Sequence, residues 1–168
     1  MKLILIRHGA AQDAQEWQAR GKNDELRPLT NAGRKKMRQA FRGVAKLAPN
    51  IELIISSPLL RARQTAEILH NEFPKAHLDE SRLLSPGTSP LQMLEVVLAQ
   101  QPGNVIALVG HEPNLGLFLG LLISGGCDAL LRFKKGAACL VEFTGLPEKG
   151  RGRLCWFAAP ATLRSLGE

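Results

Sequence analysis

A short apolar run near the start of the chain ends abruptly in charged and small residues, and this constrains the fold most. Residues 3–6 (LILI) are continuous apolar sequence, followed at once by Arg7, His8 and Gly9. Such a run is typical of a strand buried on both faces of a parallel sheet, and ligands bind at the carboxyl ends of such strands. There the three residues offer a planar cation, a nitrogen nucleophile and a backbone that can approach a ligand. A strand that simply ends in water explains these three residues equally well when they are taken alone.

The composition is that of a folded protein with a basic surface. The 168 residues fit one domain spanning residues 1–168, with 45% hydrophobic and 22% charged residues. The formal net charge of +7 favours anionic partners, whether phosphates, acidic proteins or nucleic acid. Aromatic residues make up only 5% of the chain and tyrosine is absent, which leaves a poor platform for stacking bases. We therefore do not expect nucleic-acid binding.

The cysteines and the longest apolar run bear on the cellular compartment. Cys127, Cys139 and Cys155 lack Cys-x-x-Cys spacing and follow no signal-like segment, so we expect reduced thiols in a cytoplasmic protein. We interpret Cys139 and Cys155 as core thiols. The longest apolar run, residues 115–123, is too short to span a bilayer, so no membrane association is expected.

A long stretch poor in apolar residues follows Gly9 and extends to Pro28. We predict a loop here, bordering the ligand site because it starts beside the first strand. Asp24 and Arg27 are among its charged side chains that could reach a phosphate or a protein partner. A helix from Thr30, its N-cap, to about residue 47 is then predicted. Its apolar positions at helical spacing are Met37, Ala40, Phe41, Val44 and Leu47.

A second buried strand, residues 51–55, leads directly into another helix. Ser57 and Pro58 are predicted to begin that helix, with Pro58 in its first position. Arg61 then lies in the first turn, beside a helix N-terminus that is suited to binding an anion. Arg63 points about 200° away around the helix and is expected in solvent.

The same strand-to-helix pattern recurs in the second half of the chain. A connection over residues 79–90 and a helix over residues 90–100 precede a third buried strand, residues 105–109. This strand ends in Gly110-His111-Glu112-Pro113, and an apolar helix begins near the proline. His111 therefore shares its position at a strand end with His8.

The elements together predict an α/β fold. Two alternating segments, residues 137–144 and 153–158, are expected to form an antiparallel hairpin at the sheet edge. The fold class is a three-layer α/β/α sandwich with a mostly parallel central sheet and an antiparallel edge.

Three strand ends thus deliver Arg7, His8, Arg61 and His111 to one small positive pocket, which suits phosphoryl transfer. The arginines would clamp the phosphoryl oxygens, and neutral His8 would attack phosphorus. A protonated His111 would stabilise the group in transit, and water would hydrolyse the phospho-His8 intermediate. We expect no cofactor and no metal, since no Cys/His/Asp cluster has metal-ligand spacing.

The order of the motifs resembles that of the histidine phosphatase superfamily, which has the phosphoglycerate mutase-like fold. The resemblance covers residues 2–123, and two segments, 24–30 and 57–65, are similar to the small SixA-type phosphohistidine phosphatases. The motifs are Arg7-His8-Gly9, Leu29-Thr30 with Gly33, Ser57-Pro58 with Arg61 and Thr65-Ala66, and Gly110-His111-Glu112-Pro113.

The resemblance implies a single histidine phosphatase domain with defined roles for its site residues. It implies that His8 is the phosphorylated residue. It assigns phosphate binding to Arg7, Arg61 and His111, and suggests Asp24 and Arg27 as secondary site residues. Gly9 is counted with the substrate-binding residues for its backbone.

One departure from the family pattern bears on the substrate. Larger members carry a carboxylate general acid on an insertion, whereas residues 82–88 here contain none, and Asp79 and Glu80 are the nearest acids. Losing that acid should slow hydrolysis of sugar or glycerate phosphates roughly 10²–10⁴-fold. Phosphohistidine differs, because its imidazole leaves neutral when the far nitrogen is protonated.

The sequence therefore favours a metal-independent phosphatase that acts on phosphohistidine in a partner protein such as a phosphotransfer domain, and we expect a monomer. A second hypothesis is a small-molecule phosphomonoesterase of the same superfamily, whose partner would be a small phosphorylated metabolite. A third is a non-catalytic module that binds phosphate or a phosphoprotein. Binding of nucleic acid through the net charge is the weakest alternative.

Overall fold

The computed structural model has six strands and six α-helices in the residues it describes, which are 1–48, 50–101 and 103–168. The strands are β1 (Lys2–Arg7), β2 (Leu53–Ser56), β3 (His77–Glu80), β4 (Val105–Gly110), β5 (Ala138–Glu142) and β6 (Arg153–Ala158). The helices are α1 (Ala14–Ala19), α2 (Asn31–Leu47), α3 (Leu60–His70), α4 (Pro90–Leu98), α5 (Asn114–Ser124) and α6 (Pro160–Leu166), with 3-10 turns η1 (Asp24–Leu26) and η2 (Arg82–Leu84).

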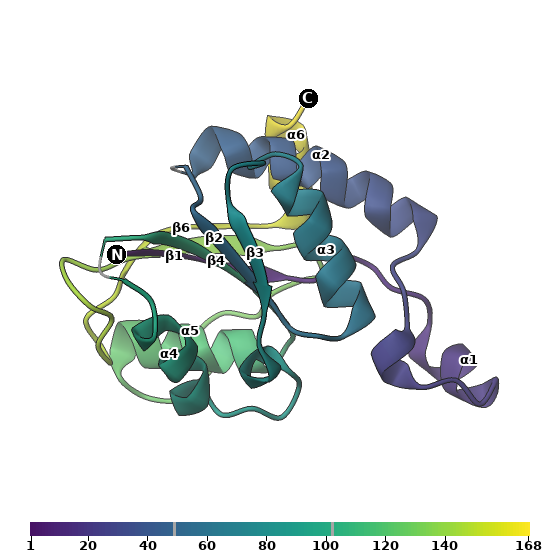
Figure 1. Ribbon diagram of the computed structural model, residues 1–168, viewed down its shortest axis with the longest axis horizontal. Helices are drawn as coiled ribbons and strands as arrows, with labels where there is room; N and C mark the ends of the chain where they lie inside the picture. The colour runs from purple at the N-terminus through teal and green to yellow at the C-terminus, as the bar shows by residue number, and fades with distance from the viewer. Residues whose placement is uncertain (49, 102) are drawn as a thin grey trace.

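The strands form one sheet in the order β3-β2-β4-β1-β5-β6. The pairs from β3 to β1 are parallel, whereas β5 pairs antiparallel with β1 and β6 antiparallel with β5. Helices α2, α3 and α6 cover one face of the sheet, and α4 and α5 cover the other (Figure 1). The predicted three-layer α/β/α sandwich, with its antiparallel edge, is confirmed.

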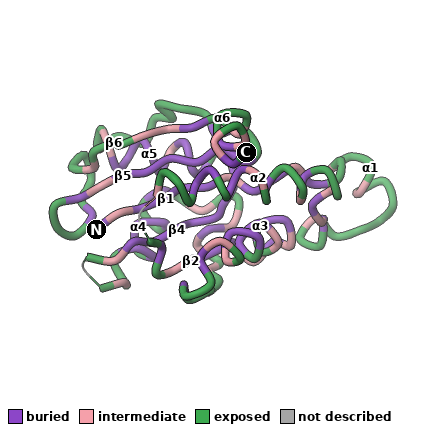
Figure 2. Tube along the Cα trace, turned by 90° about the horizontal axis from the view of Figure 1, so that it is seen from above, coloured by how far each residue is buried: buried purple, intermediate pink, exposed green. Residues whose placement is uncertain are grey.

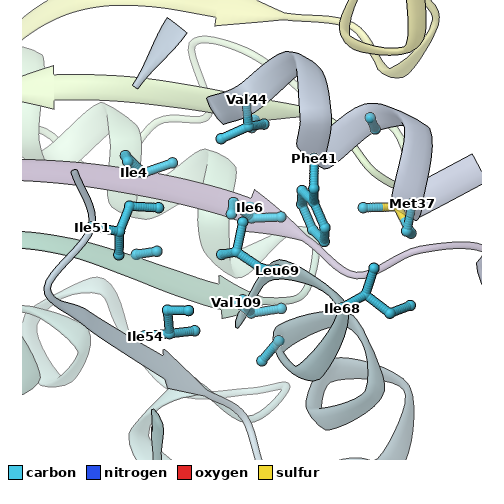
Figure 3. Close-up of a cluster of buried hydrophobic side chains, with 14 of the residues drawn as sticks. Ile4, Ile6, Met37, Phe41, Val44, Ile51, Ile54, Ile68, Leu69 and Val109 are labelled. Atoms are coloured by element: carbon cyan, nitrogen blue, oxygen red, sulfur yellow. The ribbon is translucent and has the colours of Figure 1, made fainter. Parts of the chain in front are cut away.

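The opening strand contributes to two cores because successive side chains point to opposite faces. Ile4 and Ile6 pack in the cluster beneath α2 and α3, where Phe41 lies close to them (Figure 3). Leu3 and Leu5 pack on the opposite face with residues of α4 and α5. All four are fully buried, each contributing about 1.5–3 kcal/mol. This two-sided burial explains why the run reads as continuous apolar sequence.

Helix α2 begins as predicted, because the Thr30 hydroxyl accepts a hydrogen bond from the Gly33 amide at 2.9 Å. Helix α6, which the sequence analysis did not predict, packs against α2. Gly43 permits this contact, since a Cβ there would overlap the Leu163 carbonyl. Leu47 was expected in the core but is 38% exposed, because α2 ends there beyond the sheet-facing stripe.

The stretch after Gly9 is more ordered than the predicted loop. The Asp13 carboxylate caps α1 by accepting hydrogen bonds from the Gln15 and Glu16 amides, and Asn23 caps η1. Helix α1 buries none of its residues, so it has no apolar periodicity to reveal it. Residues 12–27, hereafter the arm, extend away from the sheet at one end of the molecule (Figure 2).

Several predicted boundaries need correction. Strand β3 was not predicted. It overlaps only the start of the connection expected over residues 79–90, and it is exposed at all four residues, so it lacks the burial pattern of a core strand. Strand β2 begins at Leu53 rather than at residue 51, and α4 ends at Leu98 rather than at residue 100. Helix α3 begins at Leu60, so Pro58 precedes the helix instead of opening it.

The thiols also differ from the prediction. Cys139 is buried and lies opposite Phe157 in the β5–β6 pair, whereas Cys155 and Cys127 are exposed. Only one of the two expected core thiols is therefore in the core. Among the described residues, no helix combines the length and the apolarity that crossing a membrane requires.

Candidate functional site

A pocket of about 590 Å³ lies at the carboxyl ends of β1, β2 and β4, where the sequence places its candidate residues. His8 follows β1, Arg61 occupies the first turn of α3 after β2, and His111 follows β4. The residues lining the pocket are Arg7, His8, Ala11, Gln12, Asp13, Ala14, Asp24, Arg27, Arg61, Pro86, His111, Glu112 and Lys135. The structure thus brings Arg7, His8, Arg61 and His111 together from positions spread over more than a hundred residues.

The two imidazoles lie side by side in this pocket. Their ring centroids are 5.1 Å apart, and His8 and His111 are only 5% and 3% exposed. The Nδ1 atom of His8 lies 2.7 Å from the carbonyl oxygen of Gly9. A carbonyl can only accept, so Nδ1 carries the proton and Nε2 keeps its lone pair. One phosphoryl group can therefore contact both rings, with a nucleophilic nitrogen on His8.

Both imidazoles are neutral over the physiological pH range. Burial lowers the pKa of His8 to about 3, with further lowering by His111, Arg61 and Arg7. Burial likewise lowers the pKa of His111 to about 3, aided by the charges of Arg61 and Arg7. The expectation that His111 is protonated was wrong for the free site, because it did not account for desolvation and two nearby guanidinium groups.

Two arginines are held against the pocket by backbone and side-chain acceptors. Arg7 Nη1 donates to the Phe133 carbonyl at 2.6 Å, and Arg61 Nη1 donates to the Asp24 carbonyl at 2.9 Å. Arg61 Nη2 also pairs with Asp24 Oδ2 at 3.1 Å. Within the described part of the chain, the Nε atoms of both arginines are buried without a hydrogen-bond partner. Such unpaired donors are costly, which makes the site electrostatically suited to an anion.

Asp24 and Arg27 connect the arm to this pocket. Arg27 Nε donates to Asp24 Oδ1 at 2.7 Å, and its Nη1 donates to the Gln12 carbonyl at 2.8 Å. Burial raises the pKa of Asp24, but the hydrogen bonds and charges of Arg27 and Arg61 outweigh it and lower the pKa overall. Asp24 is thus an ionised carboxylate that positions Arg61, not a proton donor.

Gly9 was expected to bind substrate through its backbone, but it is not among the residues that line the pocket. A Cβ at Gly9 would collide with the Met37 side chain, so glycine allows the turn to pack against α2. Its amide donates to the Thr65 hydroxyl at 3.1 Å, and that hydroxyl donates to the Arg61 carbonyl at 2.7 Å. Gly9 and Thr65 therefore tie the His8 turn to the helix that carries Arg61.

Glu112 is a pocket residue to which the sequence analysis gave no role. Its Oε2 atom is buried without a partner among the described residues, and burial raises its pKa against the opposing charge of Arg7. Residues 82–88, which contain no carboxylate, contribute only Pro86 to the lining of this pocket among the described residues. The nearby Glu80 instead pairs with Arg63 at 2.9 Å. The sequence offered one signal for Glu112, namely its position next to His111.

Ser57 also had no assigned role, although its motif was noted. Its hydroxyl lies 2.9 Å from Nε2 of His111, in a fully buried position. Across the described ranges, no three His, Cys, Asp or Glu side chains gather in a way that could hold a metal ion.

The mostly parallel sheet gathers two arginines and two neutral histidines at its strand ends, which makes this an α/β protein with a pocket suited to binding an anion. The chain belongs to the histidine phosphatase superfamily. The sequence model of its branch 1 matches residues 3–84. An uncharacterized protein of Picosynechococcus sp. is 34% identical over 141 residues, which cover 80% of this chain and 81% of that protein. This membership places the chain among the phosphatases.

Two further comparisons extend over nearly the whole chain. The phosphohistidine phosphatase SixA of Escherichia coli is 27% identical over 171 residues, covering 98% of this chain and 97% of SixA. A solved structure of the protein histidine phosphatase SixA complexed with tungstate superimposes with a TM-score of 0.79 at 24% identity. That superposition covers 97% of this chain and 99% of the SixA chain, and it shows a shared fold.

Proposed function

We propose that this chain hydrolyses phosphohistidine on a partner protein through a phospho-His8 intermediate. The observation that carries the proposal is the hydrogen bond from His8 Nδ1 to the Gly9 carbonyl, which leaves the Nε2 lone pair available beside Arg7 and Arg61. Similarity to SixA of Escherichia coli, a phosphohistidine phosphatase by name, supports the same substrate class.

The chemistry proceeds in two displacements. Nε2 of His8 attacks phosphorus while the P–N bond to the substrate imidazole breaks, and the bonding electron pair leaves with that imidazole. Since its far nitrogen is protonated, the leaving group departs as neutral imidazole. Water then attacks phosphorus while the P–Nε2 bond of phospho-His8 breaks and its electron pair returns to Nε2. One proton of the attacking water passes to the phosphate product. Arg7 and Arg61 supply the positive charge for the equatorial oxygens, so the mechanism requires no metal ion.

The rim of the pocket supports a protein as the substrate. Gln12, Asp13, Pro86 and Lys135 line the pocket and are all exposed, so the site is open toward solvent. A phosphohistidine side chain projecting from a folded partner can reach such a site. A small metabolite would lose much of the enclosure that positions it.

A substrate panel tests the proposal. Initial rates of phosphate release would be measured for a phosphohistidine-bearing phosphotransfer domain, for phosphoramidate and for a sugar phosphate, each with wild type and His8→Ala. We expect fast release of phosphate from the phosphoprotein and none from the variant. Preference for the sugar phosphate would contradict the assignment. If wild type bound the phosphorylated substrates but released no phosphate from any of them, the chain would be a binding module.

Glu112 favours a second candidate, hydrolysis of phosphomonoesters. Glu112 lines the pocket and burial raises the pKa of its carboxyl group, which favours the protonated form that could supply the proton an alkoxide leaving group needs. In that case Glu112→Gln would lower the rate on an alkyl phosphate roughly 10²–10⁴-fold while leaving phosphoramidate hydrolysis nearly unchanged. Equal effects on both substrates would instead assign Glu112 to positioning Arg7.

A further inference from the structure

Ser57 occupies a position from which it can set the chemical state of His111. It lies between the end of β2 and the start of α3, and its amide donates to the Val109 carbonyl on β4 at 2.9 Å. Its side chain is fully buried, and its hydroxyl lies 2.9 Å from His111 Nε2. Both backbone and side chain of Ser57 therefore bind the strand end that carries His111.

The direction of the Ser57–His111 hydrogen bond follows from the other partner of the hydroxyl. The Leu59 amide lies 3.4 Å from Ser57 Oγ, and an amide can only donate, so Oγ accepts there. Among the described residues, His111 Nε2 is the one acceptor within reach of the hydroxyl proton. If Nε2 carried a proton instead, the Ser57 hydroxyl proton would be buried without a partner.

We propose that Ser57 fixes His111 as the tautomer protonated on Nδ1, which makes His111 an uncharged hydrogen-bond donor to the transferring phosphoryl group. This inference rests on the proposed function for its catalytic meaning. His111 lines the pocket, and its Nδ1 makes no hydrogen bond within the described part of the chain. The Nδ1 proton is therefore the one that a bound phosphate can use. Ser57 is a positioning residue, because it acts through His111.

The two imidazoles then have complementary polarity. His8 donates through Nδ1 to the Gly9 carbonyl and presents a lone pair on Nε2. His111 accepts through Nε2 from Ser57 and presents an N–H on Nδ1. Two neutral rings, with centroids 5.1 Å apart, thus divide nucleophile and donor without either carrying a charge. A protonated His111 would be disfavoured beside Arg7 and Arg61, and this arrangement avoids it.

The tautomer can be observed directly. Long-range 1H–15N spectra of the 15N-labelled protein at pH 6.5, with His8 and His111 assigned through single substitutions, report which ring nitrogen is protonated. We expect the His111 proton on Nδ1 in wild type, a mixture of tautomers in Ser57→Ala, and recovery of the Nδ1 form in Ser57→Thr. A proton on Nε2 of His111 in wild type would overturn the proposal, whatever the variants do.

Inorganic phosphate serves as the probe for the donor role. Titration should shift the His111 Nδ1 resonance in wild type, and Ser57→Ala should bind phosphate about tenfold more weakly. Ser124→Ala is the matched control, because the Ser124 hydroxyl donates to the Gly120 carbonyl in the last turn of α5. An unshifted His111 resonance, or equal phosphate affinity in Ser57→Ala and wild type, would overturn the proposal.

Turnover separates this proposal from the proposed function. With phosphoramidate as substrate, Ser57→Ala should lower kcat about tenfold relative to wild type. The kcat of the variant should not change with pH between pH 5 and 7. If wild type formed no phospho-His8, the proposed function would fail, whereas the tautomer and the phosphate titration would still decide the role of Ser57.

Discussion

The floor of the pocket, formed by His8, Arg61 and His111, differs from the arm in burial and in what sets the protonation of its side chains. On the floor, His8, Arg61 and His111 are 5%, 4% and 3% exposed. The His8 ring is held by the Gly9 carbonyl and the His111 ring by the Ser57 hydroxyl, whereas the Arg61 guanidinium pairs with Asp24 of the arm. The arm buries no residue of α1 and extends away from the sheet (Figure 2). Burial therefore sets the pKa of His8 on the floor, whereas ion pairs with Arg27 and Arg61 lower the pKa of Asp24 on the arm. We infer that the floor performs the chemistry and that the arm tunes it.

The largest effect is expected on the floor at His8. His8→Asn removes the nucleophilic lone pair and should lower turnover of phosphoramidate by at least about 10³-fold. Since His8 is neutral and buried, the fold should survive, as circular dichroism would verify. His77→Asn is the matched control, because His77 is exposed on β3, and it should retain wild-type rates. Residual activity of His8→Asn within tenfold of wild type would refute the role of His8.

Two arginines of α3 provide the next test. Arg61→Lys keeps the charge but loses the planar fork, and we expect kcat/KM to fall about 10²–10³-fold. Arg63, two residues along the same helix, is half-exposed and pairs with Glu80. Steady-state kinetics of Arg63→Lys should show no more than a twofold change. Comparable losses in the two variants would mean that Arg61 has no special place in the pocket.

The burial of neutral histidines on the floor predicts a dependence of stability on pH. The pKa of His111 is lowered to about 3, so the unfolded chain binds its proton first, at about pH 6.5. The free energy of unfolding contributed by this group therefore falls as pH drops from 6.5 toward 3, by up to about 1.4 kcal/mol per pH unit. When the free energy of unfolding, measured with urea, is plotted against pH, His111→Gln should show a correspondingly shallower slope than wild type between pH 6 and 4. An unchanged slope would contradict a neutral His111.

The smallest effect is expected on the arm. Asp24→Asn removes the carboxylate that pairs with Arg61 and Arg27, and this partly exposed network should be worth a five- to tenfold loss in kcat, about 1 kcal/mol. Removing a negative charge from the pocket should also tighten binding of inorganic phosphate, measured by calorimetry. Glu25→Gln changes the neighbouring exposed charge and should alter neither quantity. A loss as large as that of Arg61→Lys would make the arm part of the chemical machinery.

The floor was largely predictable from the sequence. Continuous apolar runs revealed β1 and β4 because both strands are buried on two faces. The residue types at their ends then indicated an anion pocket. The arm was not predictable to the same degree, since α1 depends on a polar cap and makes no core contact that would impose periodicity.

What the sequence could not supply were properties created by tertiary contact. From the sequence Ser57 is expected only at the start of a helix, whereas the fold brings His111, which follows β4, against its hydroxyl. Glu112 lies next to His111 in sequence, but its raised pKa arises from burial in the folded chain. The neutral state of His111 arises from burial and two arginines that are remote in sequence. The residue types at the strand ends could be predicted to matter from the sequence, whereas their protonation states and hydrogen-bond partners depend on the folded structure.

Trapping the covalent intermediate tests the central claim most directly. Wild type would be mixed with 32P-labelled phosphoramidate, quenched in alkali within milliseconds and mapped by peptide sequencing. The account predicts alkali-stable, acid-labile label on the peptide that contains His8, and a decay rate constant at least as large as kcat. Label on any other residue, or turnover without labelled protein at any time point, would contradict it.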